Sequence, residues 1–181
     1  MCTADRGRDR DSMATHMGLP CRSRAAVVDA GAMGISEDDA LLCSVGDRVS
    51  ARAEEVGFEN LRRPEQVFDA IWWLEAEVNN GGFDQYMFNA AGDHCEFVLD
   101  ALAEVGAHST AEICREMYAM MPDGRPSTDR YARQDQLELA HSTMGEEFGE
   151  RCTALDHRFY DTEDDLRTLM VAYVHANNLV A

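Results

Sequence analysis

Amide side chains surround a pair of adjacent glycines between residues 79 and 89. Asn79 and Asn80 precede the glycine pair, and Gln85 and Asn89 follow it. Amides donate and accept hydrogen bonds, so they could hold a polar ligand or satisfy the backbone groups that helix ends leave free. Because glycine adopts left-handed conformations without a steric cost, the pair predicts a corner between two helices. We interpret the segment as a helical corner stitched by amides, with a small-ligand pocket from Asn79 to Asn89 as the alternative.

Histidines, cysteines and paired carboxylates are the other candidates for chemistry, and their spacing matches no known catalytic or metal-binding motif. Glu138 and His141 form the only ExxH pair, whereas a dimetal carboxylate bundle requires two such pairs and further glutamates. The cysteines include no CxxC pair, and no GxSxG, GxGxxG or P-loop pattern occurs. Glu75 and Glu77 are two residues apart, which places them on different faces of a helix. The sequence therefore predicts a protein that is not an enzyme and has no metal site and no cofactor.

An excess of carboxylates is the strongest chemical signal. The 181 residues hold 34 acids against 16 arginines and no lysine, for a formal net charge of -18. Such a charge favours basic protein partners over nucleic acid. Two clusters form the candidate partner-binding surface, and their members are Glu146, Glu147, Glu150, Asp156, Asp161, Glu163, Asp164 and Asp165 in the first and Glu54, Glu55 and Glu59 in the second. The alternatives are ordinary solvated helix faces, acids that favour helix starts, and adaptation to a salt-loving host.

The amide corner is part of a longer string that resembles a known signature. Residues 77–89 read EVNNGGFDQYMFN, and this string is similar to the EVNNGGFxQYFxN signature of the bacterial DNA-mimic protein family (DMP, after the member numbered nineteen), otherwise a domain of unknown function. Met87 stands where an aromatic residue is more usual. The resemblance extends from about residue 36 to the C-terminus. The signature positions, which we expect to be structural, are Glu77, Asn79, Asn80, Gly81, Gly82, Phe83, Gln85, Tyr86, Asn89 and Gly92.

The resemblance implies an all-helical homodimer that presents acidic side chains where DNA phosphates would lie. Such a protein occupies the DNA-binding face of a partner, for example a transcription regulator. Because both copies are acidic, we expect them to join through an apolar surface, with Trp73 and Tyr86 as candidate anchors. An immunity- or antitoxin-like interaction module, in which the charge is incidental, is the alternative function.

The elements that position these residues are predicted to be helices, because apolar residues recur at helical spacing along the chain. Ser36 with Asp39 predicts the start of the first helix, and Pro64 suits the first turn of the next. Further helix starts are expected at Asp93, Ser109 and Thr162. The predicted fold class is all-α, a single compact multi-helix domain.

Residues 1–35 differ from the rest and are predicted to be a disordered N-terminal tail, or sequence translated from too early a start codon. The remaining domain, residues 36–181, holds 30 of the acids and 11 of the arginines, a formal charge of -19. No run of apolar residues is long enough for a signal peptide core or a membrane span. With its scattered cysteines, the sequence predicts a cytoplasmic protein without membrane contact.

Overall fold

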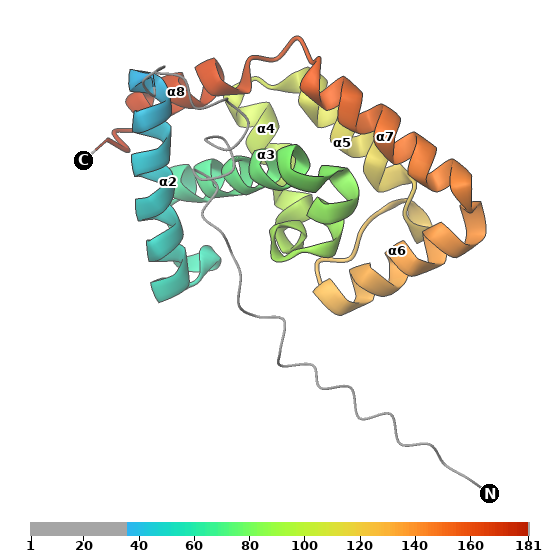
Figure 1. The fold of residues 1–181 in the computed structure, drawn as a ribbon. Coiled ribbons are helices and arrows are strands. Elements are labelled where there is room, and N and C mark those ends of the chain that lie inside the picture. The colour runs from blue at the N-terminus through green and yellow to red at the C-terminus, as the bar shows by residue number, and fades with distance from the viewer. Residues whose placement is uncertain (1–35, 181) are drawn as a thin grey trace, which may run out of the picture.

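A computed structural model describes residues 36–180, and the predicted tail at residues 1–35 lies outside this range. Seven α-helices and three short 3₁₀ turns make up the described chain, which contains no strand (Figure 1). The elements are α2 (Glu37–Val56), η1 (Phe58–Asn60), α3 (Arg63–Phe88), η2 (Ala90–His94), α4 (Cys95–Val105), α5 (His108–Ala119), η3 (Pro122–Gly124), α6 (Arg130–Met144), α7 (Glu146–Tyr160) and α8 (Leu166–Ala176). The predicted all-α class is confirmed.

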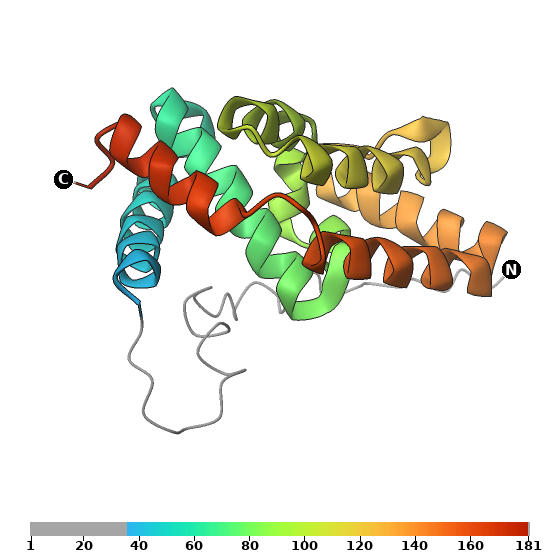
Figure 2. The ribbon, with the colours of Figure 1, turned by 90° about the horizontal axis from the view of Figure 1, so that it is seen from above.

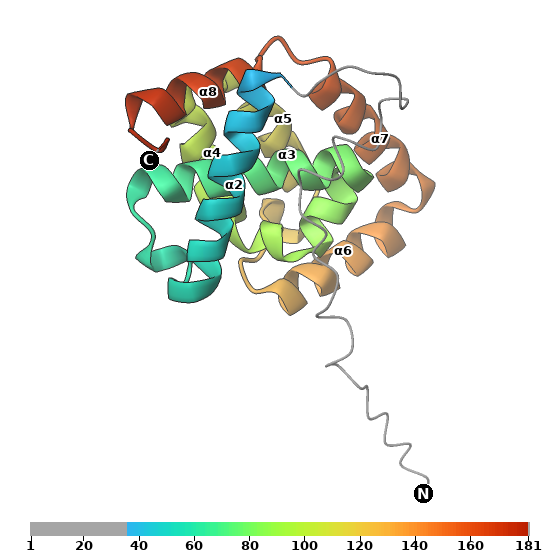
Figure 3. The same ribbon diagram turned by 60° about the vertical axis from the view of Figure 1, so that its left-hand side comes forward.

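Helix α3 runs through the middle of the molecule and forms the centre of its core. Helices α2, α4, α6 and α7 pack against it, and Figure 3 shows α2 crossing in front of it. Seen from above, α2 and α8 lie at one end of the molecule and α6 and α7 at the other (Figure 2). Phe68, Ile71, Leu74 and Val78 of α3 are fully buried, and such burial stabilises by about 1.5–3 kcal/mol per side chain. No helix among residues 36–180 has the length and apolar character needed to cross a membrane.

Two of the predicted helix starts are confirmed. The Ser36 hydroxyl accepts a hydrogen bond from the Asp39 amide, 3.1 Å away, and so caps α2. Pro64 lies in the first turn of α3, where its missing N–H costs nothing.

The other three predicted starts are wrong. No side chain caps α4, and α5 begins at His108 rather than after Ser109. The N-cap of α8 is Asp165, which accepts from the Thr168 amide, and not Thr162. Long-range contacts replace the expected local ones. The Asp164 carboxylate accepts from the backbone amide of Thr110 in the first turn of α5, at 2.7 Å.

Candidate partner-binding surface and signature corner

The glycine pair of the signature produces the predicted corner, a kink between two helical segments of α3. Gly82 has φ 77° and ψ -176°, and Gly81 also departs from helical geometry. The Gly82 conformation is one that essentially only glycine adopts. The corner is therefore present, and its backbone depends on Gly82.

Asp156 of α7 reaches this corner from far along the chain. Its Oδ1 accepts a hydrogen bond of 2.8 Å from the backbone amide of Phe83. A Cβ atom on Gly82 would collide with the same carboxylate, lying only 2.8 Å from its Cγ. Burial raises the pKa of Asp156, and the Phe83 amide partly offsets that effect. Gly82 thus has a second role, because it leaves room for an anchor from α7.

Two of the four amides stitch the corner as expected. Gln85 and Asn89 both donate to Glu77 Oε2, at 2.5 and 2.9 Å. One N–H of each amide is therefore engaged within the chain. Asn79 and Asn80, directly before the kink, are exposed.

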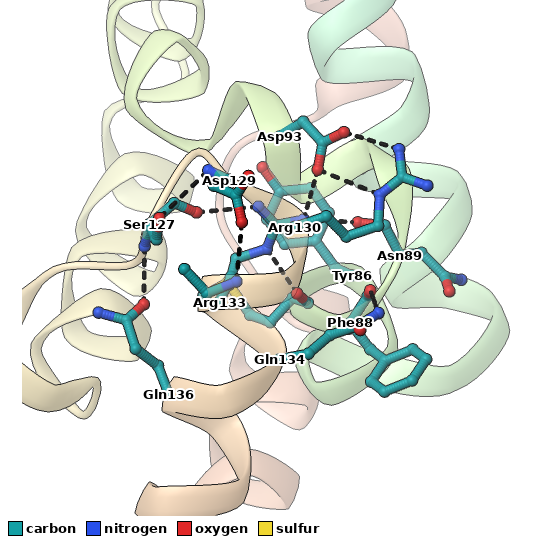
Figure 4. A network of polar contacts seen from close by, with 12 residues as sticks. Tyr86, Phe88, Asn89, Asp93, Ser127, Asp129, Arg130, Arg133, Gln134 and Gln136 are labelled. Carbon is teal, nitrogen blue, oxygen red and sulfur yellow. Dashed lines mark hydrogen bonds and ion pairs between the residues drawn. The ribbon is translucent and has the colours of Figure 1, made fainter. Parts of the chain in front are cut away.

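A buried arginine holds the segment that follows the corner, and sequence reasoning missed it. Arg133 of α6 is 0% exposed, although almost all arginines in proteins reach water. Its guanidinium donates to the carbonyl oxygens of Met87, Asn89 and Ser127 at 2.6–2.9 Å (Figure 4). The bonds to Met87 and Asn89 satisfy carbonyl groups at the end of α3, and the bond to Ser127 holds the loop before α6.

Asp93 balances the charge of this arginine. It lies 2.7 Å from both Arg133 and Arg130, and Figure 4 shows its carboxylate turned toward them. The desolvation of Asp93 opposes ionisation, but the two guanidinium groups outweigh it and lower the pKa of Asp93. A Cβ atom on Gly92 would lie 2.7 Å from Arg133 Nε. Gly92 is therefore needed for the close approach of this side chain.

The first predicted acidic cluster divides into two groups. Glu146, Glu147, Glu150, Asp161 and Glu163 are exposed on α7 and the loop after it. Asp156, Asp164 and Asp165 instead accept hydrogen bonds from backbone amides within the chain. Asp165, which remains exposed, caps the start of α8, as the helix-start alternative predicts. The sequence did not reveal the long-range contacts of Asp156 and Asp164.

The second predicted cluster is exposed as well, but it lies elsewhere. Glu54 and Glu55 are at the end of α2 and Glu59 is in η1, at the opposite end of the molecule from the start of α7 (Figures 1 and 2). One subunit therefore does not bring the two clusters together. Glu59 instead lines a hollow with Glu96 and Asp100 of α4, two acids that sequence reasoning did not select. Their four-residue spacing was the available signal, because it places both on one helix face.

Most arginines of the described chain form internal ion pairs. Nine of the eleven in the described chain pair with eight carboxylates, which leaves most of the 30 acids of residues 36–181 without an arginine partner in the described range. Glu147 illustrates the weak compensation at the start of α7, since Arg151 is 3.9 Å away. The surface charge is thus strongly negative and poorly neutralised.

The candidate dimer anchors fare differently. The prediction of Tyr86 as a dimer anchor is wrong, because its side chain is fully buried and its hydroxyl bonds that of Tyr118. Trp73 is half-buried against the core. The exposed large apolar side chains are Phe88, Tyr131, Leu139, Tyr160 and Val180. Gln134 of α6 donates to the Phe88 carbonyl, so Phe88 lies beside the helix that carries Leu139.

The candidate chemical groups are mostly engaged or inert. His141 bonds Asp84 at 3.0 Å. Cys95 and Cys114 are buried, which raises their pKa to about 11 and about 12, so both thiols stay protonated at neutral pH. Among residues 36–180, no group of three or more His, Cys, Asp or Glu is placed to hold a metal ion.

Comparison with curated proteins and with solved structures finds no match. A family model, that of the DMP19-like proteins, matches residues 59–177, which include the kinked corner, its Asp156 and Arg133 anchors and the exposed acids of α7. This match covers well over half of the chain. The protein belongs to the DMP19-like protein family.

Proposed function

We propose that the protein binds a basic DNA-binding protein, such as a transcription regulator, in place of DNA, and does so without catalysis. One observation carries the proposal. Nine of the eleven arginines in the described chain form internal pairs, while the exposed acids of α7 and of the end of α2 have little compensation. A surface of this kind accelerates encounter with positively charged partners.

The spacing of charge supports a dimer as the binding form. Duplex DNA carries one charge per about 1.7 Å of its axis, whereas a helix rises about 1.5 Å per residue and shows only some of its residues on one face. The three acids at the start of α7 therefore match only a short phosphate track. A second copy, joined through the apolar side chains of Phe88 and Leu139, would extend the track.

The test is a pull-down from the native host at low and high salt, with the eluate identified. We expect a basic DNA-binding protein that is retained at low salt and released at high salt. Recovery of a partner that is insensitive to salt would favour the immunity- or antitoxin-like module instead. Failure to recover any DNA-binding protein would refute the proposal.

A charge-reversal pair locates the binding face. Glu146→Arg with Glu150→Arg should slow association with the recovered partner, and the matched control is Asp47→Arg with Asp135→Arg, which changes the same charge at exposed sites on α2 and α6. Glu147 is left unchanged because it lies near Arg151. If both pairs slow association equally, the net charge and not α7 determines binding.

A further inference from the structure

A hollow of about 420 Å³ lies between η1, η2, α4 and the loop before α6. Its volume is within the range of ligand clefts, about 300–1,000 Å³. Phe58, His94 and Phe97 form an aromatic wall, and Glu59, Glu96 and Asp100 contribute carboxylates. Carboxylates alone would say little on so acidic a protein. The combination with aromatic rings in a concave site is more specific.

The aromatic wall is ordered by its own ring contacts. Phe58 and His94 stack with centroids 3.7 Å apart and planes 18° from parallel, and Phe97 meets Phe58 edge-on at 5.2 Å. Burial lowers the pKa of His94, so near pH 7 its ring is neutral and adds no positive charge to the wall. The faces of phenylalanine rings attract cations through the ring quadrupole.

One ring of this wall already binds a guanidinium group. Arg63 Cζ lies 4.5 Å from the centroid of Phe97, while its nitrogens pair with Glu104. An aromatic face and a carboxylate therefore hold an arginine together within this chain. The planar guanidinium stacks on rings better than the compact ammonium of lysine does.

The acids of the hollow differ in what they already bind. Asp93, on its border, is engaged by Arg130 and Arg133 (Figure 4). Glu59, Glu96 and Asp100 are exposed, and no ion pair within the described range engages them. Three carboxylates thus remain to face a cation that enters against the aromatic wall.

We propose that this hollow is the anchor site for an arginine side chain of the basic partner protein, with its guanidinium against the aromatic wall and facing Glu59, Glu96 and Asp100. The identity of the partner rests on the proposed function. The preference for a guanidinium rests on the hollow itself and can be measured without the partner.

The test is an NMR titration of the full chain with acetyl-arginine amide, followed by the backbone amide signals of His94, Glu96 and Phe97. We expect saturable shifts with a dissociation constant on the order of millimolar, as a single exposed contact allows. Acetyl-citrulline amide, of similar shape but uncharged, should produce no saturable shift, and acetyl-lysine amide should bind more weakly than arginine.

Two variants with equal charge changes separate the hollow from bulk charge. Glu96→Gln with Asp100→Asn should weaken arginine binding by about fivefold, whereas Glu146→Gln with Glu150→Gln on α7 should leave it unchanged. Absence of saturable shifts, equal binding of citrulline, or equal weakening by both pairs would overturn the proposal. Tighter binding of spermidine than of arginine would also overturn it and assign the hollow to polyamines.

The pull-down of a partner and the titration with arginine amide test separate claims. If arginine amide binds but no basic partner is recovered, the proposed function falls and the guanidinium preference remains. If a basic partner is recovered and Glu96→Gln with Asp100→Asn leaves its affinity unchanged, the anchor role falls and the proposed function remains.

Discussion

Replacing Gly82 with alanine tests the account of the signature corner. The backbone at Gly82 lies in a region that costs other residues about 1–3 kcal/mol. The added Cβ would also displace the Asp156 carboxylate from the Phe83 amide, and hydrogen bonds to charged groups contribute about 1.5–3 kcal/mol. We therefore expect the free energy of unfolding to fall by about 3–6 kcal/mol, a large part of a typical total.

Gly106→Ala is the matched control for this variant. Gly106 also has a positive φ, 86°, but a Cβ there would meet nothing within 4 Å. Its cost should be limited to the backbone term, about 1–2 kcal/mol. Urea denaturation of both variants gives the difference, which we expect to be about 1.5–3 kcal/mol, the contribution of one charged hydrogen bond.

A double-mutant cycle with Asp156→Ala identifies the cause. Without the carboxylate, Gly82→Ala should cost only the backbone strain, so its effect should shrink. The reasoning is refuted if Gly82→Ala costs no more than Gly106→Ala, or if its cost is the same with and without Asp156.

Replacing Arg133 with methionine should lower the free energy of unfolding by about 3–5 kcal/mol in urea denaturation, because Asp93 and three carbonyl oxygens lose their buried partner. A loss of stability below about 1 kcal/mol would count against the network. Asp69→Asn should stabilise the protein above pH 7, since burial raises the pKa of Asp69 to about 6 and its ionised form is disfavoured in the fold. For an acid whose folded-state pKa is raised, this stability penalty is complete above pH 6 and disappears below the unfolded-state pKa of 3.8. The melting temperatures of parent and variant should therefore converge near pH 4. A stability gain of the variant that persists at pH 4 contradicts the assignment. Changing Phe88 and Leu139 together to serine should convert a dimer to a monomer in sedimentation at micromolar concentration without changing the melting temperature, whereas a monomeric parent would contradict the dimer.

The fold class and the corner were predictable from the sequence because both depend on local rules. Apolar periodicity predicted the helices, Ser36 and Pro64 marked two helix starts, and the glycine pair marked the kink. The Asp156 and Arg133 anchors were not predictable, since their partners at Phe83 and Met87 lie 73 and 46 residues away in the sequence.

The acidic surface was predictable only as a composition. Asp156 and Asp164 looked like part of one exposed run, but the backbone amides that they bind belong to α3 and α5. Asp165 remains exposed and caps α8, as the helix-start alternative predicts. Conversely, Glu96 and Asp100 lie outside both runs and meet Glu59 only because η1 folds against α4. Which carboxylates remain free for a partner is decided by tertiary contacts.

Competition with DNA tests the central claim most directly. The recovered partner is bound to its labelled DNA, and the protein is added at several DNA concentrations and at low and high salt. We expect the protein to displace the DNA, with an apparent inhibition constant that rises in proportion to DNA concentration and weakens with salt, because both ligands use the same basic face. A ternary complex of partner, DNA and protein, or displacement that is indifferent to DNA concentration, would contradict the claim that the protein takes the place of DNA.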